Sequence, residues 1–377
     1  MFLLLSSLLR YAPRANCRLS EIGIVRNICQ KPALITKKTQ PGAVAIAKEP
    51  QKVAAVVPRD KLELIESHHY CVNHVKRYDR ENYLAALCIQ DSKLLRRTLF
   101  ALRAFNVELS LIRDMTTNSD RAKLRFHFWS RLIDEIIKRN NDPLPDLDKD
   151  IAYYKHTPVA KELLDIFHMI DIDHQIETYL RDLVGARVSS KVLGYKPFDD
   201  MRELELYCSK SNTPIYQLAW RLDFQLNNIF NPTDELWEDL QRISDDLGVA
   251  HGLSNVIRGI PYNSTKNCCY IPQDLLQKYQ LTNRDFVTKK LDGEKVRPVV
   301  VALASRCQEL SDQVYGRLGD VPDHFRRIFL PRVSIQSNLK VLKKCNYNIC
   351  DPRVNRRNEL LPLSLKLASI YFRAPII

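Results

Sequence analysis

Apolar residues recur at helical spacing along most of the chain. From residue 60 onward, leucine, isoleucine, valine and phenylalanine fall three or four positions apart, which places them on one face of a helix. Strand patterns are almost absent, because the short apolar run Val299–Val301 lies inside a helical pattern. Thr233, followed by two acidic residues, predicts a cap for a helix that begins at 234. The spacing predicts helices over 93–115, 121–139, 158–172, 174–192, 201–230, 234–258, 294–318, 323–346 and 357–372.

Nothing in this pattern divides the helical region. Residues 60–377 contain no internal repeat and no low-complexity boundary, so we expect one all-α domain over that range. Glycine is scarce, at 10 of 377 residues, and the 19 prolines suit helices joined by short connections. The chain has no G-x-G-x-x-G and no G-x-x-x-x-G-K motif, which counts against the glycine-rich nucleotide-binding folds.

The first 59 residues differ from the rest in charge. They hold ten Lys or Arg and two acids, so they carry +8 of the net charge of +13. Residues 1–31, with an apolar face beside arginines and the single acid Glu21, are typical of a mitochondrial transit peptide. Residues 32–59, rich in Pro, Ala and Val, predict a flexible linker. A secretory signal fits less well, because the apolar run Phe2–Leu9 is short and follows no positive charge; a cytosolic tail is the other alternative.

The remainder of the chain gives few signs of a ligand. It holds 47 basic and 42 acidic residues, or +5, so we expect no nucleic-acid binding. Ten cysteines are scattered without a C-x-x-C spacing, which favours reduced thiols over a disulfide framework or a metal site. The spacing of His68, His69 and His74 does not place them on one helix face, so we expect them on a solvated helix. No run of 18 apolar residues is present, and we expect no membrane-spanning helix.

Two stretches carry more information than their spacing. Residues 99–114 read LFALRAFNVELSLIRD, and residues 247–274 read LGVAHGLSNVIRGIPYNSTKNCCYIPQD. Both resemble motifs of the squalene/phytoene synthase family, and HTPV at 156–159 and LELYC at 204–208 add to the resemblance. The resemblance implies a single all-helical domain of the isoprenoid-synthase type. In that fold a central cleft lies between the two helices that carry the motifs.

The resemblance also implies where a metal would bind. Enzymes of the family hold Mg²⁺ and a prenyl diphosphate between two helices, each with acids at i and i+4, which lie on one helix face. In this chain the first pair of positions falls at Ser110 and Asp114. The second pair falls at Gly259 and Asn263, so three of the four acids are replaced.

Further departures concern the polar lining of the cleft. Positions that carry polar side chains in the family hold Val107, Gly252 and Cys268. The lining retains Asn255, Arg258 and Asp114. Because the loss of one charge-stabilising group typically costs about 10²–10³ in rate, we expect no catalysis. We also expect neither a bound metal nor a cofactor.

Three shorter segments resemble one branch of the family. They read FNVE at 105–108, LRFHFW at 124–129 and NELLPL at 358–363. The branch works in the assembly of mitochondrial respiratory complex I, the NADH:ubiquinone oxidoreductase. The resemblance implies a non-catalytic assembly factor that acts at an early step by protein contact, peripherally on the matrix side of the inner membrane, with complex I subunits or other assembly factors as partners. Two alternatives stay open: a prenyl- or lipid-binding protein, and a prenyl transferase with an altered metal site.

Polar positions of the expected cleft also have structural explanations. Asp114 fits a solvated acid near a helix end, and Arg258 fits an ion pair within the fold. Asn106 and Glu108 suit either the lining of the cleft or contacts on the helix surface. A cleft without acids still has apolar walls to cover, so we expect bulky side chains or a lipid tail to occupy part of it. The candidate side chains are Leu109, Ile112, Val256 and Ile260. Residues 360–377 either close the core or lie on a membrane or partner.

Deletion of residues 1–31 is expected to abolish mitochondrial import, because this basic, acid-poor segment is the expected import signal. Uptake into isolated mitochondria, measured as protection from added protease, checks this. Replacing Lys37 and Lys38 with Gln, outside the segment, should leave import intact. Delivery of the deletion variant at the rate of the full chain would contradict the prediction.

Overall fold

The computed structural model describes residues 59–116, 118–141, 154, 156–194, 196–227, 233–288, 290–355 and 367. The expected transit peptide, the expected linker up to Pro58 and, apart from Leu367, the helix expected over 357–372 lie outside these residues. Within the described residues every regular element is a helix and no strand is present. The prediction of an all-α fold is therefore confirmed.

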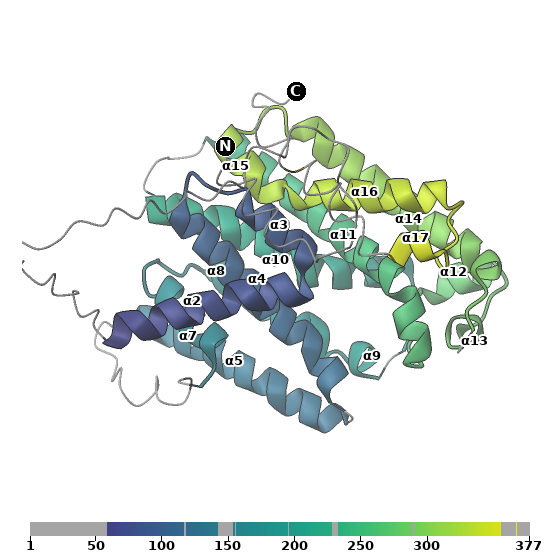
Figure 1. The fold of residues 1–377 in the computed structure, drawn as a ribbon, viewed down its shortest axis with the longest axis horizontal. Helices are drawn as coiled ribbons and strands as arrows, with labels where there is room; N and C mark the ends of the chain where they lie inside the picture. Colours follow the sequence, from purple (N-terminus) through teal and green to yellow (C-terminus); the bar gives the residue numbers. More distant parts are fainter. Residues whose placement is uncertain are drawn as a thin grey trace, which may run out of the picture. The chain divides into compact units, whose positions relative to one another are not determined.

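The helices pack as a bundle in which α10 and α11 run through the middle (Figure 1). The first half contains α2 (Arg59–Tyr78), α3 (Arg80–Leu87), α4 (Lys93–Met115), α5 (Ser119–Asn141), α7 (Pro158–Phe167), α8 (His174–Val188) and α9 (Ser190–Leu193). The second half contains α10 (Met201–Asn227), α11 (Asp234–Thr265), α12 (Gln273–Lys278), α13 (Asn283–Phe286), α14 (Gly293–Arg317), α15 (Asp323–Arg326), α16 (Pro331–Lys344) and α17 (Pro352–Asn355). A 3-10 turn, Arg327–Phe329, links α15 to α16.

Helix ends differ from the predicted ones mainly where the chain changes direction. The helix predicted over 323–346 is divided, and α16 begins at Pro331, because proline is tolerated in a first turn but not in a helix interior. The helix predicted over 174–192 is likewise divided into α8 and α9. In contrast, α11 runs on to Thr265, seven residues beyond its predicted end at 258. Thr233 caps α11 as predicted, since its side chain accepts a hydrogen bond from the Leu236 N–H at 3.3 Å.

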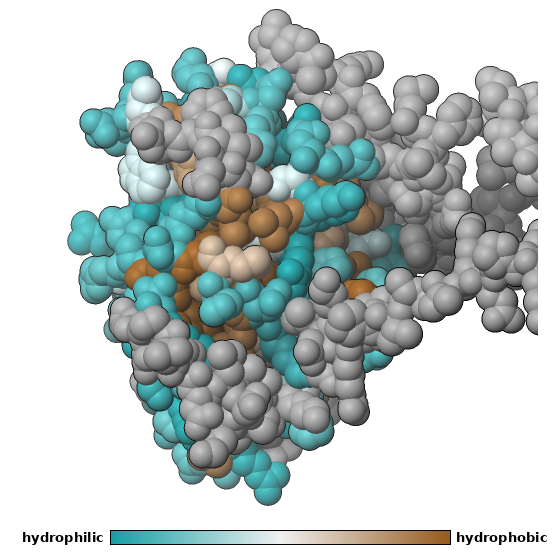
Figure 2. Space-filling model, turned by 90° about the vertical axis from the view of Figure 1, so that its left-hand side faces the viewer, coloured by the Kyte–Doolittle hydropathy of each residue, from teal (hydrophilic) through white to brown (hydrophobic). Residues whose placement is uncertain are grey.

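One face of the bundle exposes apolar surface. Figure 2 shows hydrophobic side chains gathered near the centre of the face that looks left in Figure 1, with hydrophilic side chains around them. Among individual residues, Leu124 of α5 is 70% exposed and Met115 of α4 is 63% exposed. Among the described helices, none combines the length and apolar character needed to cross a membrane.

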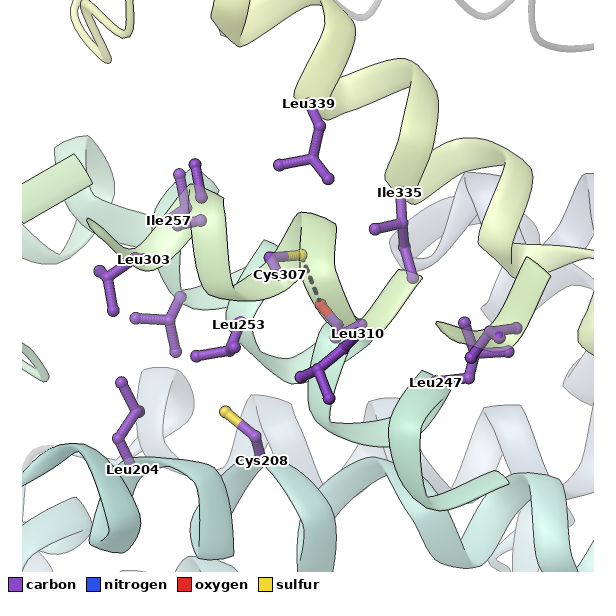
Figure 3. Packing of buried hydrophobic residues seen from close by; sticks show 14 of the residues in the cluster. Leu204, Cys208, Leu247, Leu253, Ile257, Leu303, Cys307, Leu310, Ile335 and Leu339 are labelled. Carbon is purple, nitrogen blue, oxygen red and sulfur yellow. Dashed lines mark hydrogen bonds between the residues drawn. The ribbon is translucent and has the colours of Figure 1, made fainter. Parts of the chain in front are cut away.

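The main core lies where α10, α11, α14 and α16 meet. Figure 3 shows side chains of these four helices pointing into the same space. They include Leu204 and Cys208 of α10, Leu247, Leu253 and Ile257 of α11, Leu303, Cys307 and Leu310 of α14, and Ile335 and Leu339 of α16. The Cys307 thiol donates a hydrogen bond to the Ala250 carbonyl at 3.2 Å, which satisfies a buried polar group between α14 and α11. Burial of this apolar surface is the main driving force for assembling these helices.

Two glycines let α11 approach α10 closely. A Cβ atom at Gly252 would lie 2.7 Å from the Cys208 Cα, and one at Gly248 would lie 2.6 Å from the Thr213 Cα. Both distances are shorter than van der Waals contact, and the atoms met are backbone atoms that cannot move alone. The packing of α10 on α11 therefore requires glycine at both positions.

On the other side of the bundle, α2 is fastened to α4 and α7 by charged groups. The Glu162 carboxylate is fully buried and accepts hydrogen bonds from Arg97 Nε at 2.7 Å and from His68 Nδ1 at 3.2 Å. His74 lies 3.1 Å from Glu108 of α4. The expectation of a solvated helix at these histidines is therefore wrong for His68 and His74, because carboxylates on neighbouring helices pair with them.

Gly252→Ala is expected to destabilise the protein by about 1–3 kcal/mol, the usual cost of overpacking a close-packed core. The loss should appear despite the helix propensity of alanine, which favours it over glycine by about 1 kcal/mol. Gly316→Ala on α14 is the matched control, because a Cβ there meets nothing within 4 Å. Urea unfolding followed by circular dichroism measures both. Equal stability of the two variants would show that α10 and α11 can separate without cost.

Candidate functional site

The C-terminal end of α4 meets the end of α11 and the segment that follows it. Arg113 of α4 makes the connection: its Nη1 donates to the Tyr270 hydroxyl at 2.5 Å, and its Nη2 donates to the Asn263 Oδ1 at 3.5 Å. The same Nη2 lies 3.4 Å from the Asp114 carboxylate. The guanidinium thus joins Asp114 and Asn263, one position from each of the two motifs.

Local backbone geometry places these groups. The Ser92 side chain caps α4 by accepting from the Leu95 N–H at 3.0 Å. After α11 ends, Asn267 takes a left-handed conformation with φ of 55°, which asparagine tolerates better than most residues. The Cys268 N–H then donates back to the Asn263 carbonyl at 2.9 Å. This reversal turns the chain so that Tyr270 reaches α4.

The side chains at the expected metal positions do not fit Mg²⁺. Ser110 is exposed, and its hydroxyl donates to the Val107 carbonyl of its own helix at 2.8 Å. Gly259 offers no ligand, and the Asn263 amide faces the Arg113 guanidinium. Mg²⁺ takes oxygen ligands and usually carboxylates. Asp114 is the one carboxylate at the four positions, and the Arg113 guanidinium lies 3.4 Å from it. No group of three His, Cys, Asp or Glu side chains that could hold a metal occurs within the described part of the chain.

The Arg113 guanidinium stays protonated. Burial opposes its charged form, but the neighbouring Tyr270 hydroxyl and Asp114 carboxylate outweigh this and raise its pKa above the ordinary arginine value. Tyr270 stays neutral, because burial raises the pKa of its hydroxyl more than Arg113 lowers it. The Tyr270 hydroxyl donates in turn to the Val192 carbonyl at 3.2 Å. A permanent positive charge therefore occupies the space between the two motifs.

Behind Arg113 lies a second layer of polar and aromatic groups. The Tyr207 and Tyr270 rings are stacked, with centroids 6.4 Å apart. Arg187 of α8 is buried, and its Nη2 donates to the Asn106 Oδ1 at 2.7 Å. Burial, and then the like charge of Arg113, lower the pKa of Arg187. Asn106 of α4 therefore contacts the neighbouring helix α8.

The structure does not bring the remaining sequence-predicted positions to Arg113. Arg258 donates to the Glu81 carboxylate at 2.9 Å, so it forms the ion pair with α3 that the sequence allowed as an alternative. Asn255 is exposed, and its side chain makes no hydrogen bond to the described residues. Gly252 faces Cys208 of α10, where a longer side chain would meet the backbone. The site at Arg113 thus contains Asp114 and Asn263 from the predicted set.

Four bulky residues were expected to cover apolar walls of the cleft. Their exposed fractions are 1% for Leu109, 3% for Ile112, 7% for Val256 and 5% for Ile260. Val256 and Ile260 of α11 pack within the main core cluster. A lipid tail in the same region stays a prediction.

The comparison of sequences with known families gives one match over most of the chain. The model described as "Squalene/phytoene synthase" matches residues 75–363. The resemblance inferred from the two motifs is therefore confirmed.

Individual relatives agree with this match. "NADH dehydrogenase (ubiquinone) complex I, assembly factor 6" of Rattus norvegicus is 26% identical, over 81% of this chain and 82% of its own length. The protein described as its homolog in Drosophila melanogaster is 28% identical, over 84% of this chain and 89% of its own length. A crystal structure of a dehydrosqualene synthase in complex with ligand superimposes with a TM-score of 0.60 at 16% identity, covering 82% of this chain and 97% of that one. This likeness confirms the isoprenoid-synthase type of fold.

Acidic side chains restored at the expected metal positions should bind Mg²⁺ only weakly while Arg113 is present. We expect weak Mg²⁺ binding by the triple variant Ser110→Asp, Gly259→Asp, Asn263→Asp. Adding Arg113→Gln to it should tighten Mg²⁺ binding by about tenfold or more. The reason is that a like unit charge 4 Å away costs about 1–4 kcal/mol near a protein surface. Isothermal titration with Mg²⁺ alone measures the difference. Ser110→Asn with Gly259→Asn, which leaves residue 263 as asparagine, serves as the uncharged control. Equal Mg²⁺ affinity with and without Arg113 would contradict its role.

Proposed function

The chain belongs to the squalene/phytoene synthase family, and from this premise we propose that it is a non-catalytic factor for the assembly of mitochondrial respiratory complex I. The non-catalytic part of the proposal rests on the position of Arg113. Its guanidinium contacts Asn263 and Asp114, where the family's chemistry needs a divalent cation. Without that cation, the charge of a departing diphosphate would not be neutralised.

The assembly part of the proposal rests on the named relatives. The rat and fruit-fly proteins named for complex I assembly match more than four-fifths of this chain. The matched length makes it reasonable to carry the role to the whole helical domain, 60–377, rather than to one motif. We propose complex I subunits or other assembly factors as partners, contacted at an early step.

The surface supports action by protein contact. Contiguous exposed apolar surface is unusual on a soluble monomer unless it binds something, and Figure 2 shows such a gathering of hydrophobic side chains. The basic N-terminal segment supports mitochondrial delivery, and we place the protein peripherally on the matrix side of the inner membrane. A prenyl transferase with an altered metal site is disfavoured, because Arg113 opposes a metal in any nearby position.

Re-expression in cells that lack the protein tests this function. Asp114→Ala and Asn255→Ala should restore complex I, measured on native gels, to nearly the level given by the unchanged chain, because neither side chain acts in catalysis. Trp129→Ala should fail, since the ring is 4% exposed and lies 5.1 Å from that of Phe105, and truncating a buried Trp costs about 3–5 kcal/mol.

Two results would contradict the proposal. One is loss of complex I with Asp114→Ala or Asn255→Ala while the protein stays folded and abundant, which would make these positions a working site. The other is Mg²⁺-dependent release of diphosphate from farnesyl or geranylgeranyl diphosphate well above a heat-killed control.

A further inference from the structure

The N-terminal part of α5 exposes a leucine between two arginines. Arg121, Leu124 and Arg125 are exposed, and because they are three and four positions apart they share one face of the helix. Leu124 is 70% exposed. The opposite face of α5 packs on α4, α7 and α8, and Figure 1 shows α5 along the lower edge of the bundle. This basic and apolar face therefore points away from the helices that hold α5.

A second exposed apolar side chain lies beside the first. Met115 ends α4 and is 63% exposed. The Arg125 guanidinium contacts its thioether, with 4.0 Å between Nη1 and Sδ. Because Arg125 follows Leu124 directly, both apolar side chains lie at the same end of α5. Met115, Arg121, Leu124 and Arg125 together form what we call the α5 patch.

The α5 patch carries an excess of positive charge. Over residues 119–131 the helix holds four Arg or Lys and one acid, Asp120, which lies 3.2 Å from the Lys123 ammonium. Arg121 forms no ion pair with any described residue. Further along the helix Lys138 is exposed as well. Residues 121 to 138 span roughly 25 Å at the rise of an α-helix, so the positive charge follows a long, straight line.

This combination fits the surface of an anionic bilayer. Lys and Arg are attracted to anionic headgroups, while apolar side chains beside them enter the boundary between headgroups and acyl chains. An acidic protein surface would attract the same arginines, but it would need acids in matching positions around a pocket for Leu124. A fluid bilayer supplies headgroup charge and acyl chains around any protruding side chain, and a straight line of charge suits a flat surface.

We propose that the α5 patch docks the protein on an anionic phospholipid surface. Leu124 and Met115 enter the headgroup region, and Arg121 and Arg125 contact the headgroups. The inference rests on the proposed function in one respect, the peripheral placement on the inner membrane, for which it names the contacting face. The partner is the lipid surface itself, and no protein of complex I takes part in the contact.

A tryptophan at position 124 reports membrane contact at this face. The full chain with Leu124→Trp is mixed with vesicles of phosphatidylcholine and phosphatidylglycerol whose acyl chains are brominated, since bromine quenches indole fluorescence only at close contact. We expect the fluorescence that this tryptophan adds to fall by half or more. Co-sedimentation would not locate the contact, because the basic N-terminal segment also attracts anionic vesicles. Leu124 is largely exposed, so the substitution leaves the core intact.

Tyr315→Trp is the matched control for position. Tyr315 is 53% exposed on α14, which lies across the bundle from α5 (Figure 1). The fluorescence added by this variant should stay unchanged on the same vesicles. Vesicles of brominated phosphatidylcholine alone should quench neither variant, because they carry no net charge.

Charge variants test the role of the arginines. Arg121→Gln with Arg125→Gln, added to Leu124→Trp, should raise the vesicle concentration for half-maximal quenching by about tenfold or more, since each basic residue near an anionic surface contributes about fivefold to binding. Lys340→Gln with Lys343→Gln removes the same charge from exposed positions of α16 and should leave the quenching of Leu124→Trp unchanged.

Four outcomes would overturn the proposal. Three are absence of quenching for Leu124→Trp on anionic vesicles, equal quenching on phosphatidylcholine alone, and equal quenching for Tyr315→Trp. The fourth is loss of complex I in cells that carry Arg121→Gln and Arg125→Gln, without any vesicle contact at position 124, which would assign the α5 patch to an acidic protein surface. The assembly function is judged separately by native gels, so its failure is distinguishable from failure of the lipid contact.

Discussion

The contact between α10 and α11 is the constraint on which the rest of the fold depends. The two helices touch through backbone at Gly248 and Gly252, which leaves no freedom to slide or rotate without a steric clash. With that contact set, the other faces of α11 are set as well. One side carries Leu247, Leu253 and Ile257 into the core shared with α14 and α16. Another side of α11 directs Arg258 to Glu81, and the last turn of α11 presents Asn263 to α4.

The same contact gives a structural reason for glycine at residue 252, where the family pattern has a polar side chain. From the sequence, Gly252 appears only as the loss of a polar group. In the structure its missing side chain is the reason α10 and α11 can meet, since any Cβ would press on the Cys208 backbone. A change that removes a polar group from the lining therefore also tightens the core.

The helices were predictable because their signal is local. Apolar spacing predicts helices in the regions that α4, α5, α7, α10, α11 and α14 occupy, and Thr233 marks the start of α11. The bridge made by Arg113 was not predictable, because it depends on the turn at Asn267 that returns Tyr270 to α4. Arg187 did leave a signal: it continues the buried series Ile176, Leu180 and Leu183 on α8, where an apolar residue belongs. A charged residue in an apolar series is a cue for a buried polar site that the motif comparison alone does not reveal.

Arg113 connects the geometry of the cleft with the non-catalytic role that we propose. A diphosphate leaving group departs only when its charge is neutralised as it develops, and metal ions supply that neutralisation by direct coordination. Guanidiniums can bind the same oxygens in the ground state through hydrogen bonds, yet binding that is equally strong before and during reaction does not accelerate it. Under the non-catalytic role that we propose, neutral residues stand where the family pattern has acids, and the helical scaffold acts through its surface.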